Sequence, residues 1–427
     1  IWLVVPLLLA GGWLLRTRVR PAIQLGLLGC ALVGGSAVLV LAGLLDGPSA
    51  SAILADRLSA ALMVLTAFIG AVILQYSRRY LAGQARQGVY VQQLLATLAT
   101  VWLMVGSGHL LVMVLAWMAN DGLVHRLLLF FDRRPAALLA ARKRLLVAGL
   151  ANVLLLGMVF WLYQHYGTLS LPALLDAAQH AAHPDMLLGP ALLLVLAVIL
   201  KTAQLPTHGW ILQVMEAPTP VSALLHAGII NMGGYVLLRL SPLLDVAPAA
   251  QGLLVAVGTL TAVGAALVML TRISVKVMLA WSTCAQMGLM LVEIGLGAYG
   301  LALLHLLAHA LYKAHAFLSA GRTAAFITGV RNAPLSPQPL PAGTLFWMVL
   351  AGLVLLLGGW LASDRDQQVM GLLGWVFVVG LWPWLQQGSG VASAGRRWGA
   401  VLVLCCSYAV LHAGFASLWP GAAHVRS

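Results

Sequence analysis

Apolar segments of helix length recur along the whole chain, and they restrict its fold more than any other feature of the sequence. A segment of about twenty apolar residues is long enough to cross a hydrocarbon core of roughly 30 Å. We predict about fourteen such spans, at residues 1–15, 22–45, 53–76, 89–106, 109–131, 145–166, 186–212, 217–240, 250–270, 274–296, 299–321, 342–362, 369–387 and 397–419. Runs of this kind lack the alternation of barrel strands, and lipid offers backbone groups no hydrogen bonds. The sequence therefore predicts an all-α integral membrane protein, with residues 1–427 in a single transmembrane domain.

The charged residues support this class and predict an orientation. Only 8% of the residues are charged, against about 25% in soluble domains. The net charge of +13 comes largely from basic residues that follow every second span: Arg16, Arg18, Arg20, Arg78, Arg79, Arg86, Arg133, Arg134, Arg142, Lys143, Arg144, Arg272, Arg322, Arg331, Arg396 and Arg397. Arg57, Arg239 and Arg365 are exceptions. Loops rich in Lys and Arg stay in the cytoplasm, so both termini are predicted to be periplasmic. The same distribution explains the basic excess without a nucleic-acid partner.

Residues 201–220 predict a broken helix. Lys201 ends an apolar run, and Pro206, Pro218 and Pro220 follow it. Proline removes a backbone donor and interrupts a helix. An ammonium at bilayer depth costs about 3 kcal/mol on insertion scales, so a lysine kept there is by default a functional residue. A purely structural ion pair is the alternative role for Lys201.

A second polar region covers the two spans between residues 274 and 321. His305, His309 and Lys313 are spaced i, i+4, i+8 and therefore lie on one helix face, while Lys276 lies near the start of the preceding span. Because histidine titrates near neutral pH and a desolvated lysine exchanges protons, the stripe predicts a proton or ion pathway. The alternatives are helix-packing hydrogen bonds for the histidines and, for Lys276, snorkelling to the membrane interface. A histidine pair without a third ligand does not predict a metal site.

Few acidic residues are available to balance these lysines. The two glutamates of the chain, Glu216 and Glu293, are both candidate counter-charges. Glu216 has an alternative role at the start of the helix that begins near Pro218, because a negative charge is favourable there.

Two long motifs carry a family resemblance. The first is Lys201-Thr-Ala-Gln-Leu-Pro-Thr-His-Gly-Trp210 with Pro218-Thr-Pro-Val-Ser-Ala-Leu-Leu-His-Ala227. The second is Ser274-Val-Lys-Val-Met-Leu-Ala-Trp-Ser-Thr-Cys-Ala-Gln-Met-Gly288 with His305-Leu-Leu-Ala-His-Ala-Leu-Tyr-Lys-Ala-His-Ala-Phe-Leu-Ser-Ala-Gly321. They resemble the seventh, eighth, tenth and eleventh helices of the antiporter-like proton-translocating subunits of respiratory complex I and of Mrp cation/proton antiporters. Shorter matches, Asp56-Arg-Leu-Ser59 and Tyr76-Ser-Arg-Arg-Tyr80, extend the likeness over roughly residues 50–325.

The resemblance implies a fold and a set of pathway residues. In this family two inverted five-helix repeats each contain a broken helix, and lysines and histidines form a central polar axis. The residues that match this axis are Lys201 in the broken helix, His226 on the next helix, and Lys276, His305, His309 and Lys313 further along. Protons or sodium would thus enter near Lys313 and pass His226 to reach Lys201.

Two positions depart from the family pattern. The fifth helix normally carries a glutamate after a tryptophan, as counter-charge to the broken-helix lysine. Here Met118 follows Trp117, and Asp121, one turn on, is the candidate substitute. The twelfth helix normally bears a lysine or glutamate, whereas residues 342–362 contain no ionisable residue. These gaps favour gradient-coupled conduction over redox-driven pumping.

Within the family, the segments Val214–Gly228 and Tyr312–Leu318 are most similar to the DabB group, the membrane subunits of inorganic-carbon accumulation complexes in the bacterial inner membrane. Members of this group pair with DabA, a large peripheral subunit with a zinc site similar to that of β-carbonic anhydrases. The resemblance implies a non-enzymatic chain without a cofactor of its own, which conducts protons or sodium to energise carbon dioxide hydration on the zinc partner. The alternative is a proton-translocating subunit of a complex I-like, hydrogenase-like or Mrp assembly.

Overall fold

Helices form every regular element in the part of the chain that the computed structural model describes, residues 3–45, 56–131, 135–180, 184–214 and 217–321. Nine helices among these residues are long and apolar enough to cross a membrane, so the predicted all-helical membrane fold is confirmed. The total of fourteen spans, the inverted repeats and the single domain stay predictions. The segments at 342–362, 369–387 and 397–419 lie outside the described residues.

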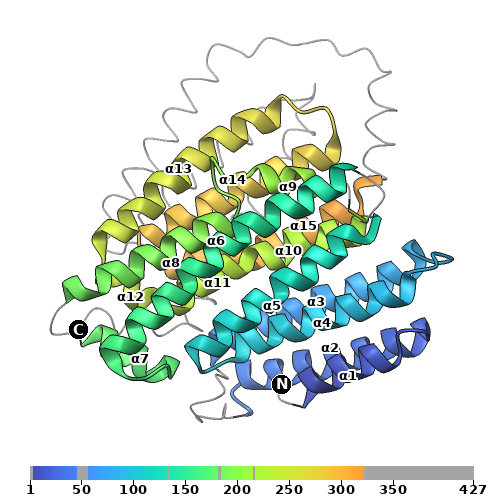
Figure 1. The fold of residues 1–427 in the computed structure, drawn as a ribbon, viewed down its shortest axis with the longest axis horizontal. Coiled ribbons are helices and arrows are strands. Elements are labelled where there is room, and N and C mark those ends of the chain that lie inside the picture. Colours follow the sequence, from blue (N-terminus) through green and yellow to red (C-terminus); the bar gives the residue numbers. More distant parts are fainter. Residues whose placement is uncertain (1–2, 46–55, 132–134, 181–183, 215–216, 322–427) are drawn as a thin grey trace, which may run out of the picture. The chain divides into compact units, whose positions relative to one another are not determined.

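The helices follow the order of the apolar segments (Figure 1). They are α1 (Val4–Leu14), α2 (Val19–Leu41), α3 (Arg57–Tyr80), α4 (Gln87–Gly106), α5 (Leu110–Leu128), α6 (Pro135–Tyr166), α7 (Leu171–Gln179), α8 (Leu188–Lys201), α9 (Gly209–Gln213), α10 (Thr219–Ala227), α11 (Met232–Arg239), α12 (Ser241–Asp245), α13 (Pro248–Leu270), α14 (Val275–Gly295) and α15 (Tyr299–Leu318). Short 3₁₀ segments occupy Leu129–Phe131, Pro184–Leu187 and Ile229–Asn231.

Most of these helices pack within one unit, which comprises Ile1–Gly295 and Leu306–Ala325, while Leu296–His305 belong to a second unit. In the first unit α1 packs on α4, α2 on α3, α4 on α5, α6 on α8 and α13 on α14 (Figure 1). The outer face of α13 exposes large apolar side chains such as Leu260 and Leu267, as expected of a surface covered by lipid.

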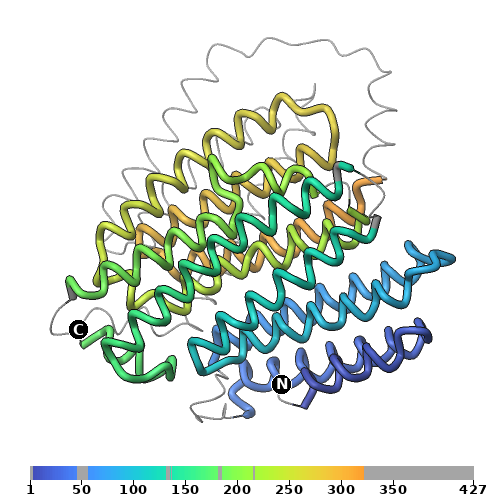
Figure 2. The backbone as a smooth tube through the Cα atoms, in the orientation of Figure 1, coloured from blue at the N-terminus to red at the C-terminus, as the bar shows by residue number. Residues whose placement is uncertain are grey.

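The helix is interrupted directly after Lys201, and the chain crosses to α9 and α10 through an irregular segment (Figure 2). The apolar segment 186–212, predicted as one span, is therefore α8 followed by the short α9. Ala203, with a φ of 56°, ends α8 in the left-handed conformation, and the amide of Gln204 donates to the carbonyl of Ile199 (3.3 Å). The amide of Leu205 donates to Thr261 Oγ1 of α13 (3.1 Å). Neighbouring groups thus satisfy these two backbone amides at the break, as membrane depth requires.

A second interruption separates α10 from α11. α10 ends at Ala227, and a 3₁₀ turn over Ile229–Asn231 precedes α11. The Asn231 side-chain amide donates to the carbonyl of Ala227 (2.8 Å). A 3₁₀ turn in the middle of a long helix is a frequent place for a functional hinge.

Glycines allow α13 and α14 to approach closely. A Cβ atom at Gly288 would lie 2.7 Å from both the amide nitrogen of Ala262 and the carbonyl oxygen of Gly258. Both obstacles are backbone atoms, which a side-chain rotation cannot move. Small residues at such a contact stabilise membrane helix pairs by close packing.

Gly288→Ala is expected to lower the free energy of unfolding by about 1–3 kcal/mol, because α13 and α14 must separate to admit the methyl group. Thermal unfolding of the detergent-solubilised protein measures this loss. Gly252→Ala in α13 is the control, since no atom lies within 4 Å of a Cβ at Gly252. Equal unfolding temperatures for the two variants would contradict the close contact.

Candidate functional site

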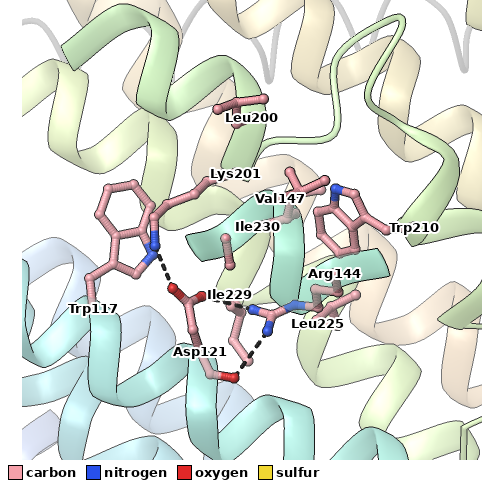
Figure 3. A pocket seen from close by; sticks show the side chains of 11 residues that line it. Trp117, Asp121, Arg144, Val147, Leu200, Lys201, Trp210, Leu225, Ile229 and Ile230 are labelled. Atoms are coloured by element: carbon pink, nitrogen blue, oxygen red, sulfur yellow. Dashed lines mark hydrogen bonds and ion pairs between the residues drawn. The ribbon is translucent and has the colours of Figure 1, made fainter. Parts of the chain in front are cut away.

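Lys201 forms a buried ion pair with Asp121 (Figure 3). Its Nζ lies 2.5 Å from Asp121 Oδ2 and 4.3 Å from the centre of the Trp117 ring. Trp117 and Asp121 are four residues apart and therefore share one face of α5, which turns both towards the end of α8. The carboxylate of Asp121, one turn beyond the position of the family's usual glutamate, thus reaches Lys201.

Arg144 is the residue of this site that sequence reasoning assigned elsewhere. The charge pattern places it in a basic loop, but α6 begins at Pro135, so Arg144 lies within the helix and is buried. Its Nη2 donates to Asp121 Oδ1 (3.0 Å) and its Nη1 to the Asp121 carbonyl (3.1 Å). Its neighbours Arg142 and Lys143 are exposed. One carboxylate consequently serves two buried cations.

A small cavity, about large enough for one water molecule, adjoins the three charged side chains. Figure 3 shows Trp210 on one wall, with Leu225 and Ile229 on α10 and the following 3₁₀ turn. Leu225 directly precedes His226 in the chain. The cavity therefore lies between the end of α8 and the interrupted helix that carries His226.

A second network joins Lys313 to His226. Lys313 Nζ donates to Ser282 Oγ (2.7 Å) and to the carbonyl of Leu279 (3.1 Å). The same carbonyl accepts from Thr283 Oγ1 (3.0 Å), which lies 3.1 Å from His226 Nδ1. Lys313 and His226 are fully buried. Within the described residues Lys313 contacts no carboxylate, so its ammonium is held by neutral oxygens.

The remaining α15 residues are placed differently. His309 Nδ1 lies 3.3 Å from Asn231 Oδ1, at the interruption between α10 and α11. His305 is half-buried in the part of α15 that belongs to the second unit.

Lys276 makes a separate set of contacts near the start of α14. Its Nζ donates to Thr219 Oγ1 (3.2 Å), which lies 3.4 Å from the hydroxyl of Tyr80, a half-exposed side chain. This hydrogen-bonded connection runs from the buried first turn of α10 and the half-buried first turn of α14 to the surface. The order of steps along the predicted pathway stays a prediction.

The two glutamates have separate outcomes. Glu293 is buried in α14 but is not among the groups that contact Lys201 or Lys313. Glu216 lies outside the described residues. Asp121 is therefore the predicted counter-charge that the structure places against a lysine of the pathway.

Arg239, an exception to the charge pattern, is explained by a third cluster. Its guanidinium binds both carboxylate oxygens of Asp56 and the hydroxyls of Ser59 and Tyr235. Tyr235 in turn donates to the carbonyl of Val105 (2.8 Å). The end of α11 is thereby tied to the start of α3 and the end of α4.

A helical membrane bundle with interrupted helices, a buried lysine and histidine beside the breaks and a further buried lysine nearby fits an antiporter-like membrane subunit. The chain belongs to the family described as NADH:quinone oxidoreductase/Mrp antiporter, transmembrane, whose model matches residues 107–359.

Individual relatives agree with this family. The chain is 49% identical over 271 residues to the probable inorganic carbon transporter subunit DabB of Hydrogenovibrio crunogenus, a match that covers 62% of this chain and 52% of that protein. It is 34% identical over 270 residues to NADH-quinone oxidoreductase subunit L of Mycobacterium tuberculosis, covering 62% of this chain and 42% of the relative. The matched region thus spans about half the length of these relatives or less.

A solved structure supports the fold. The Mrp complex from Dietzia sp. DQ12-45-1b contains a chain that matches 99% of this one, with a TM-score of 0.66 and 26% identity, over 46% of its own length.

Asp121→Asn is expected to lower the free energy of unfolding by about 3–5 kcal/mol, because two buried cations then lack a counter-charge. Lys201→Met is expected to cost less than half as much, since Asp121 and Arg144 remain a balanced pair. Thermal unfolding of both variants in one detergent makes the comparison. A larger loss for Lys201→Met than for Asp121→Asn would contradict the shared carboxylate.

Proposed function

We propose that this chain is the membrane subunit of an inorganic-carbon uptake complex of the bacterial inner membrane, and that it conducts protons or sodium. The observation that carries the proposal is the buried Lys201–Asp121 pair at the helix break, in a chain 49% identical to a protein named as a probable inorganic carbon transporter subunit. Buried charges at membrane depth mark ion and proton pathways.

Arg144 suits the pair to proton exchange. When Lys201 is protonated, the three side chains carry one net positive charge. When Lys201 gives up its proton, Asp121 and Arg144 still balance each other through the 3.0 Å contact. The site thus changes its charge without leaving a buried carboxylate alone, which avoids the large cost of an unpaired buried ion.

The partner in this proposal is a large peripheral DabA-like protein with a carbonic-anhydrase-like zinc site. Hydration of carbon dioxide takes place on that partner, and this chain is not itself an enzyme. Ion flow from Lys313 past His226 to Lys201 biases the partner towards trapping bicarbonate in the cytoplasm.

A proton-translocating subunit of a complex I-like, hydrogenase-like or Mrp assembly is the second candidate. It is favoured by the 34% identity to a subunit L and by the likeness to the Mrp complex. Met118 counts against it, because members of this family usually carry a glutamate at that position, directly after the tryptophan, and this chain carries a methionine there.

Lys201→Ala and Lys313→Ala are each expected to abolish carbon accumulation without preventing assembly, since each removes a buried titratable group of the pathway. Growth in ordinary air of cells that lack carbonic anhydrase, with and without an uncoupler, measures the activity of the intact complex. Lys143→Ala, which removes an exposed lysine beside Arg144, is the matched control. Full activity in both pathway variants would refute the proposal.

The identity of the proteins that co-purify with this chain discriminates between the two candidate functions. Purification of the tagged chain from its native membrane is expected to bring down a single large zinc protein, identified by mass spectrometry and metal analysis. Recovery of iron–sulfur subunits or of several Mrp-type subunits would instead establish the second candidate.

A further inference from the structure

His226 is closely packed in the last turn of α10. Its side chain is fully buried, and its ring stacks on Phe317 with the ring centres 4.4 Å apart and the planes 18° from parallel. Phe317 is itself fully buried among Ala223, Leu279 and Ala320. The stack opposes a flip of the imidazole ring about its Cβ–Cγ bond, which would exchange the two edges of the ring.

The partners of Thr283 determine which ring nitrogen carries the hydrogen. Its hydroxyl has one hydrogen, and the carbonyl of Leu279, 3.0 Å away, can only accept. With the hydroxyl hydrogen donated to Leu279, as the shorter of the two contacts favours, Thr283 offers a lone pair towards His226. The 3.1 Å contact then requires that His226 Nδ1 donate. In a neutral imidazole the other nitrogen, Nε2, is consequently the acceptor.

A proton cannot leave His226 from Nδ1 by way of Thr283. A proton given to Thr283 would have to displace the hydroxyl hydrogen onto the Leu279 carbonyl, and a peptide carbonyl is far too weak a base to carry it. That carbonyl also accepts from Lys313 Nζ (3.1 Å). Nε2, in contrast, is buried without a hydrogen-bond partner among the described residues.

We propose that His226 stores a proton and exchanges it at one ring nitrogen only, Nε2. Thr283 is a positioning residue that fixes the Nδ1–H tautomer, and a proton that binds Nε2 leaves again from Nε2. His226 therefore holds a charge next to the Lys313 network rather than passing a proton through its ring. The tautomer is independent of the proposed function, and only the activity arm of the test rests on that function.

Solid-state nitrogen-15 NMR of the histidine-labelled protein in lipid bilayers tests the tautomer. The His226 signal is identified by its absence in His226→Asn. Wild type and Thr283→Ser are expected to show the Nδ1–H form, because serine keeps the hydroxyl. Thr283→Val, which has nearly the same shape, is expected to shift His226 to the Nε2–H form that neutral imidazole favours in water. An Nε2–H form in wild type, or an unchanged tautomer in Thr283→Val, overturns the assignment.

Carbon accumulation by the assembled complex tests the storage role. Thr283→Val is expected to lose at least about tenfold in rate, and Thr283→Ser to keep most of the activity, because only the former misplaces the accepting nitrogen. If Thr283→Val shifts the tautomer but accumulates carbon at the wild-type rate, proton storage at His226 is refuted. If Lys201→Ala and Lys313→Ala are also fully active, the proposed function fails while the tautomer assignment stands.

Discussion

The interaction on which the site depends is the sharing of one carboxylate by two buried cations. Asp121 on α5 binds Arg144 on α6 and Lys201 at the end of α8, so three helices meet at a single negative charge. Both cations are buried, so the energetic cost of losing this partner is correspondingly large. The packing of α6 on α8 and of α5 on α6 encloses the charges, and the break after Lys201 leaves room for the adjoining cavity.

Both interrupted helices present a titratable side chain at the same kind of position. Lys201 lies in the last turn of α8, and His226 lies in the last turn of α10. The carboxyl end of a helix carries a partial negative charge, which stabilises a cation there. A break in a membrane helix thus creates both the irregular backbone that admits polar neighbours and a local field that favours a positive charge. Continuous helices would offer neither at this depth.

The sequence predicted the features that follow from hydropathy and backbone chemistry. Apolar runs predicted the membrane helices and the prolines after Lys201 predicted the break. The family resemblance pointed to Asp121, one turn beyond Met118, as the substitute counter-charge. Arg144 was assigned to a loop because charge alternation cannot tell how far α6 extends before its apolar part. The sequence marks Thr283 only as a polar residue in an apolar span and does not single out Asn231, because small polar side chains in membrane helices have many packing roles. Their importance depends on which partner lies opposite, and that is a property of tertiary packing.

The cluster around Arg239 has a mechanical consequence for the neighbouring interruption. Asp56, Ser59 and Tyr235 clamp the far end of α11 to α3 and α4, whereas His226 lies at the end of α10 that adjoins the interruption. Between them lies the 3₁₀ turn at Ile229–Asn231, where regular α-helical hydrogen bonding is interrupted. A mid-helix turn of this kind often marks a hinge. If α10 moves, we therefore expect the change to be taken up at this turn, beside the His309–Asn231 contact, rather than in the anchored half of α11.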